Sequence, residues 1–129
     1  DHRDLHSFPT RRSSDLVHEA NFAIQKLQAE GHSVELVDIR TIAPLDEETI
    51  IKSVKKTGKA VIIHEDTLTA GSGAEIAARI TDKCFEYLDG PVKRIAAADT
   101  PIPYHPNLEN VVLPNRNKIY SSIKELLAY

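Results

Sequence analysis

The sequence has a single cysteine, neither tryptophan nor methionine, and only 5% aromatic residues among its 129 residues. Because Cys84 has no second cysteine to pair with, an intramolecular disulfide is excluded, and its position at helical apolar spacing predicts a buried, unreactive thiol. No apolar run approaches the ~20 residues that a membrane-spanning helix requires. The net charge of −3 lacks the basic field of a nucleic-acid-binding protein. We therefore expect neither a membrane nor a nucleic acid as a partner.

Short apolar runs alternate with amphipathic segments along most of the chain. The run Ala60–Ile63 shows no polar alternation, which is typical of a strand covered on both faces. Strands that alternate with helices imply parallel pairing through right-handed crossovers. The sequence thus predicts an α/β fold of three layers, α/β/α, with a mostly parallel sheet. The expected strands are 34–39, 60–64 and 92–96, and the expected helices are about 17–30, 47–57, 73–88 and 116–127.

A polar triplet, His64-Glu65-Asp66, follows the apolar run Ala60–Ile63. It lies at the carboxyl end of the expected strand, where open α/β sheets usually place their sites. A histidine beside two carboxylates suits proton transfer or half of a metal site. Adjacent strand residues point to opposite faces, however, and no partner lies at zinc-site spacing. We therefore expect no metal site and no catalytic residue here, and we interpret Glu65 as an acid that organises a loop or an interface.

Two further segments invite a functional interpretation. Gly71 and Gly73 open a helix, but Ile76 stands where a dinucleotide motif needs its third glycine, and Glu75 would repel a phosphate. These glycines are expected to permit a turn and close helix–sheet packing. The stretch 99–104, D-T-P-I-P-Y, combines two stiffening prolines with an amphipathic tyrosine. It is interpreted either as an interface loop or as a structural strap.

Three phrases together resemble one family: V-E-L-V-D-I-R-T-I-A-P-L-D-E-E-T-I (34–50), H-E-D-T-L-T-A-G-S-G-A-E-I (64–76) and D-T-P-I-P-Y (99–104). They are similar to the C-terminal, transketolase-type domain of the beta subunit of thiamine-diphosphate 2-oxo acid dehydrogenases, over about 17–129. The resemblance implies oxidative decarboxylation of pyruvate or a branched-chain 2-oxo acid, with acyl transfer to a lipoyl group. It also implies that thiamine diphosphate and Mg²⁺ are held elsewhere in the parent assembly, so this chain alone is expected to bind neither and to be inactive.

The same resemblance implies partners and a bacterial, cytoplasmic location. The partners would be an alpha subunit, a second beta subunit and the small basic binding domain of a lipoyl acyltransferase. On helix 73–88, Asp82 and Glu86 are the residues expected to dock that basic domain. The residues expected at subunit interfaces or at the edge of the substrate channel are Arg40, His64, Glu65, Asp66, Asp99 and Tyr104.

The first sixteen residues differ from the rest. Residues 1–16, D-H-R-D-L-H-S-F-P-T-R-R-S-S-D-L, resemble the translation of a sequencing adapter and are expected to lie outside the fold, leaving 17–129 as the domain. Members of the family carry an apolar strand just before the first helix, between the strands equivalent to 34–39 and 60–64. We therefore expect a fold truncated by its first core strand, with two unpaired edges and marginal stability.

Two alternatives stay open. Transketolase and deoxyxylulose-phosphate synthase use the same domain type, although phosphorylated sugars call for cations near the strand ends, and Arg40 is the only obvious one. A non-enzymatic interaction module of doubly wound type is the second alternative. Within the favoured family, the phrase H-E-D-T-L-T-A-G leans slightly toward branched-chain enzymes.

Overall fold

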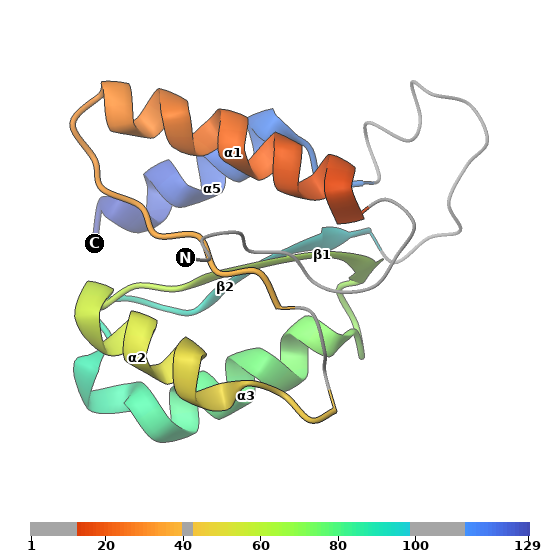
Figure 1. The fold of residues 1–129 in the computed structure, drawn as a ribbon, viewed down its shortest axis with the longest axis vertical. Helices are drawn as coiled ribbons and strands as arrows, with labels where there is room; N and C mark the ends of the chain where they lie inside the picture. Colours follow the sequence, from red (N-terminus) through yellow and green to blue (C-terminus); the bar gives the residue numbers. More distant parts are fainter. Residues whose placement is uncertain (1–12, 40–42, 99–112) are drawn as a thin grey trace.

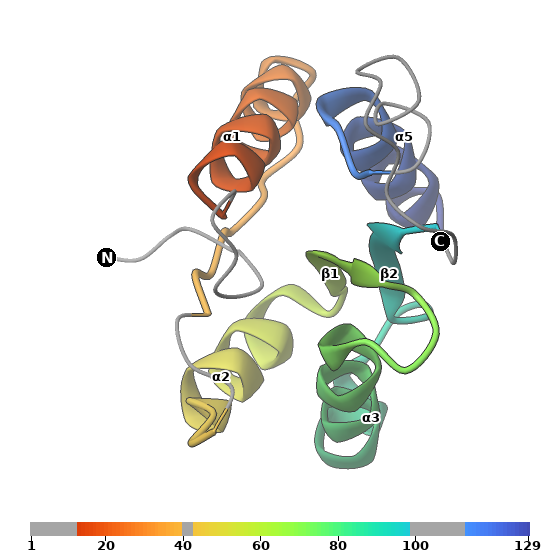
Figure 2. The ribbon, with the colours of Figure 1, turned by 90° about the vertical axis from the view of Figure 1, so that its right-hand side faces the viewer.

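The computed structural model describes residues 13–39, 43–98 and 113–129. Two parallel strands form the middle layer, with α1 and α5 on one face and α2 and α3 on the other (Figures 1 and 2). The expected three-layer α/β/α class is confirmed. The elements are α1 (Ser13–Ala29), α2 (Glu47–Thr57), β1 (Val61–Thr67), α3 (Ser72–Cys84), the 3₁₀ turn η1 (Phe85–Tyr87), β2 (Lys93–Ala97) and α5 (Arg116–Leu127).

Helix α2 shows why these segments become helices. Asp46 caps its start, accepting a hydrogen bond from the Thr49 backbone N–H, as expected from the sequence. Gly58 ends it in the left-handed region with φ of 76°, and its N–H donates to the Val54 carbonyl. Acidic residues in the first turn and Lys55 and Lys56 in the last both complement the helix dipole.

The sheet buries both of its faces. β1 pairs with β2 in parallel, with Ile63 opposite Ile95. Successive residues of β1 pack into hydrophobic clusters on opposite faces of the sheet. Ile63 packs with the buried residues of α1 and α5, and Ile62 packs with those of α2 and α3. An apolar strand that is covered on both sides therefore explains the run that the sequence displays.

One predicted strand is absent. Residues 34–39 do not form a strand, although Leu36 and Ile39 are buried at 6% and 7% exposure. The apolar pattern correctly predicts burial, but a strand also needs a hydrogen-bonded neighbour. Within the described residues, the sheet has only β1 and β2, so the extended segment 33–39 has no strand beside it.

The remaining differences concern the ends of helices. The helix predicted over 73–88 is shorter in the structure: α3 ends at Cys84, the chain continues as η1, and Tyr87 is 43% exposed. The predicted boundary at residue 16 falls inside α1, where Leu16 is buried at 2% exposure. α5 occupies 116–127 as predicted, and its Arg116 holds α1 through an ion pair with Glu19 at 2.8 Å.

Candidate functional site

The whole polar triplet lies within β1, because the strand continues to Thr67 instead of ending at His64 as predicted. Its side chains have different environments: His64 is fully buried at 0% exposure, Glu65 is half-buried and Asp66 is exposed. Simple alternation does not explain this, since His64 and Asp66 would share a face; the pairing with β2 is irregular between Ile63 and Thr67. The His64 ring, which was expected at an interface or channel edge, therefore offers no exposed surface in this chain.

The start of α3 lies directly against that ring. A Cβ added to Gly73 would lie 2.3 Å from His64 Nε2, and one added to Gly71 would lie 2.8 Å from His64 Cε1. Real Cβ atoms do not approach other atoms so closely. The two glycines let the first turn of the helix pack onto the imidazole, which supports the packing interpretation made from the sequence.

The electrostatics of His64 favour the neutral ring. Burial lowers the pKa of His64 below its usual value; the nearby Asp66 carboxylate opposes this shift, and the Arg94 guanidinium adds to it. Neither ring nitrogen makes a hydrogen bond to the rest of the described protein. Burial thus favours the neutral imidazole, and within the described residues the ring packs against the start of α3.

Of the other predicted site residues, Arg40, Asp99 and Tyr104 lie outside the described residues. Among the residues that are described, no group of three potential ligands could hold a metal ion. None of the helices in this described part has the length and apolar character needed to cross a membrane.

The predicted docking residues lie on an exposed surface. Asp82 is in α3 and Glu86 in η1, and both side chains are exposed. Between them Phe85 is 74% exposed, a feature that the helical pattern did not reveal. The neighbouring cations are already engaged: Lys83 and Arg79 both pair with Glu47, at 2.6 and 3.3 Å. Asp82, Phe85 and Glu86, here called the acidic–aromatic patch, thus combine two carboxylates with an apolar ring.

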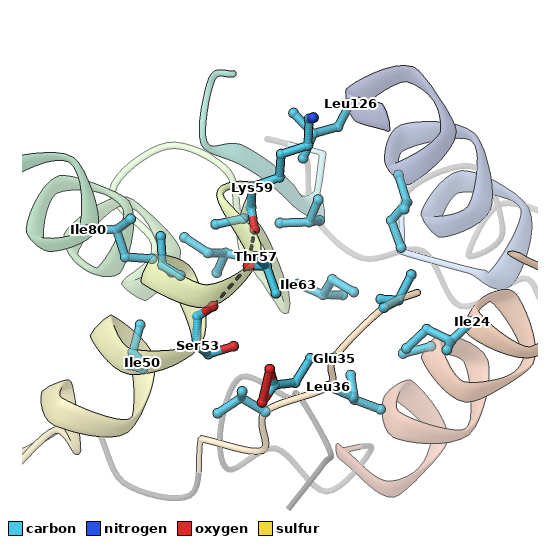
Figure 3. Close-up of a pocket in the computed structure, with 18 of the residues that line it drawn as sticks. Ile24, Glu35, Leu36, Ile50, Ser53, Thr57, Lys59, Ile63, Ile80 and Leu126 are labelled. Carbon is cyan, nitrogen blue, oxygen red and sulfur yellow. Dashed lines mark hydrogen bonds between the residues drawn. The ribbon is translucent and has the colours of Figure 1, made fainter. Parts of the chain in front are cut away.

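A cavity of about 230 Å³ occupies the middle layer between β1 and the extended segment 33–39 (Figure 3). Helices α1, α2, α3 and α5 contribute apolar side chains to its walls, including Ile24, Ile50, Ile80 and Leu126, and β1 contributes Ile63. The prediction of marginal stability stays a prediction, which a cooperative, monomeric melt of residues 17–129 would contradict.

The layer order and the parallel sheet define a doubly wound α/β domain, and the sequence comparisons agree. A family model for "Transketolase, C-terminal domain" matches residues 13–119. The chain belongs to the transketolase C-terminal domain family. A solved structure described as "Split gene transketolase, inactive beta4 tetramer" matches with a TM-score of 0.76 and 19% identity, over 99% of this chain and 39% of that one. That likeness shows the fold.

Closer relatives are beta subunits. "Pyruvate dehydrogenase E1 component subunit beta" of Staphylococcus aureus (strain Mu50 / ATCC 700699) is 42% identical over 114 residues, covering 88% of this chain and 35% of the relative. The protein of the same name from Rhizobium meliloti (strain 1021) is 44% identical over 102 residues, covering 79% of this chain and 22% of the relative. The resemblance to the C-terminal domain of a beta subunit is confirmed, and the chain spans about a third or less of these relatives.

Proposed function

We propose that this chain is the C-terminal domain of the beta subunit of a 2-oxo acid dehydrogenase, and that the parent enzyme decarboxylates pyruvate. The observation that carries the proposal is the 42% identity to a pyruvate dehydrogenase E1 beta subunit over 114 residues, a span that includes most of the described fold. The substrate is taken from the names of these relatives, while the phrase H-E-D-T-L-T-A-G keeps branched-chain 2-oxo acids as the competing substrate class.

The domain's own role would be assembly and docking. The parent reaction uses thiamine diphosphate, which supplies the carbanion chemistry when bound, and Mg²⁺. The buried imidazole of His64 packs against the start of α3, which supports a scaffold role for this part of the domain. The proposed partners are an alpha subunit, a second beta subunit and a lipoyl acyltransferase, in the bacterial cytoplasm.

Sequencing the genomic DNA upstream of the codon for Val17 tests this proposal. We expect an in-frame thiamine-binding domain there, and we expect the complete beta subunit, expressed with its alpha partner, to oxidise pyruvate faster than branched-chain 2-oxo acids. Reduction of an artificial electron acceptor measures the rate. A start codon directly before Val17 would instead support an interaction module, and turnover of phosphorylated sugars would support the transketolase alternative.

The docking role makes a separate prediction for the acidic–aromatic patch. In the complete assembly, Asp82→Lys and Glu86→Lys should each weaken binding of the basic acyltransferase domain by about tenfold at low salt, since each replaces attraction by repulsion. The loss should shrink at high salt, because screening weakens exposed charge pairs. Calorimetric titration measures the affinity. Glu48→Lys, an exposed reversal on α2, is the matched control; an equal loss in that variant would remove the assignment.

A further inference from the structure

The fully buried ring of His64 lies against the start of α3 without a polar partner. Neither of its nitrogens makes a hydrogen bond within the described protein, and the same holds for the buried hydroxyl of Ser72 in the first turn of α3. Gly71 caps that helix without a side-chain hydrogen bond, and a Cβ at Gly71 or Gly73 would clash with the imidazole. The ring therefore faces the amino end of α3, where the free N–H groups and the positive end of the helix dipole lie.

A protonated His64 would be poorly accommodated in this position. An imidazolium donates at both nitrogens, whereas the neighbouring end of α3 offers further donors and a positive dipole. Two charged groups of the described residues act on the ring: Arg94 of β2 disfavours its protonation and Asp66 of β1 favours it. Glu75, in the first turn of α3, is already paired at 2.7 Å with the arginine one turn further along. The packing of α3 on the ring thus favours the neutral imidazole.

The segment beside the ring is a short turn, residues 68–71, that joins β1 to α3 and is here called the α3 turn (Figure 1). Ala70 within it has φ of 60°, in the left-handed region that residues with a Cβ rarely adopt. The Leu68 N–H donates to the Ala97 carbonyl at 3.0 Å, and Arg94 Nη1 donates to the Leu68 carbonyl at 2.6 Å. Both contacts hold the first residue of the turn to the sheet, so its later residues can separate from β1 while the strands stay paired.

We propose that protonation of His64 opens the α3 turn and the first turn of α3, while the sheet and the other helices stay folded. The proton comes from solvent and binds the imidazole once the ring is exposed. Because the closed form holds the ring neutral, the ratio of open to closed molecules should rise by up to about tenfold per pH unit below about 6.5, the pKa of a solvated histidine. Above that pH the closed form keeps its full advantage. This device is independent of the enzymatic role proposed above.

The place of the α3 turn in the fold gives its opening a consequence. The turn follows the carboxyl end of β1, and open α/β sheets present their sites at that edge. Leu68 is 37% exposed there, so opening alters a surface that a partner or ligand can reach. Mild acid is therefore expected to remodel this edge of the sheet before the fold as a whole is lost.

Amide hydrogen exchange of the full chain, corrected for the intrinsic effect of pH, tests the opening. The Ala74 N–H donates to the Gly71 carbonyl at the start of α3 and reports it, and the Ile123 amide in the middle of α5 reports global unfolding. Between pH 7.5 and 5.5 the protection of Ala74 should fall by about tenfold. At pH 5.5 it should change less than about twofold in 1 M urea, whereas Ile123 exchange should accelerate, because a local opening exposes little surface.

Two results in the unmodified chain would overturn the proposal. Protection of Ala74 that is equal at pH 7.5 and 5.5 would mean that acid does not open the turn. An equal acceleration of Ala74 and Ile123 exchange by urea would mean that the opening is global.

Two histidine variants assign the acid effect. His64→Phe keeps an aromatic ring in the same space but binds no proton, so the protection of Ala74 should no longer depend on pH. His18→Phe, at an exposed position of α1, is the matched control and should keep the loss seen in the unmodified chain. Where His64→Phe does not fold, His64→Gln, which does not titrate either, makes the same comparison. A loss that persists without the histidine at position 64, or that disappears in His18→Phe, would overturn the proposal.

Discussion

Replacing Gly73 by alanine is expected to destabilise the domain by about 3 kcal/mol, the upper part of the range for overpacked cores. The added methyl would lie 2.3 Å from His64 Nε2 and 2.5 Å from His64 Cδ2. Because the ring is fully buried, it has no solvent-facing space into which it can rotate. Alanine is a better helix former than glycine, so a net loss of stability would report the steric conflict. Urea unfolding followed by circular dichroism measures it.

A double-mutant cycle with His64→Ala provides the control for Gly73→Ala. Once the imidazole is removed, the methyl at position 73 occupies the vacated space, so the second substitution should become neutral or stabilising. The His64→Ala change itself creates a cavity and serves as the reference state. If the two substitutions destabilise additively, the contact between α3 and the ring is not what requires glycine.

Acidification should weaken the fold through His64. The folded-state pKa of His64 is lowered by burial, so the unfolded chain takes up the proton more readily. The stabilisation is thus fully present above the unfolded pKa of about 6.5, and it is lost as the pH falls below that value, by up to about 1.4 kcal/mol per pH unit. Urea midpoints measured at pH 7.5, 6.5 and 5.5 report this slope.

A non-titrating ring supplies the control for the acid effect. His64→Phe keeps an aromatic group in the same space and should flatten the dependence between pH 7.5 and 5.5. The Glu19 carboxyl, whose pKa is lowered chiefly by its hydrogen bonds to Arg116, loses its stabilisation only below about pH 4.5 and so falls outside this window. An unchanged slope in His64→Phe would show that another group titrates.

The sequence predicted those parts of the fold that depend on local chemistry. Asp46 and Gly58 mark the ends of α2 because capping is decided within a few residues. The apolar run before His64 correctly implied a strand covered on both faces. Segment 34–39 failed as a strand because pairing depends on a neighbour distant in sequence, and an apolar pattern reports burial alone.

The candidate site was harder to predict. His64 reads as a polar residue at a strand end, and only the approach of Gly71 and Gly73 shows that its ring is buried under α3. A helix was predicted over 73–88, yet α3 ends at Cys84, and Phe85 and Tyr87 of η1 lie exposed. Both outcomes depend on where one helix begins and ends, which is the least predictable aspect of a helix.

The central claim is that this chain is a non-catalytic domain of a larger decarboxylating enzyme. The most direct measurement adds pyruvate, thiamine diphosphate, Mg²⁺ and an artificial electron acceptor to the purified chain and follows acceptor reduction. We expect a rate equal to that of the same mixture without protein. Acceptor reduction that rises in proportion to the concentration of the chain would place catalytic groups within these 129 residues and contradict the account.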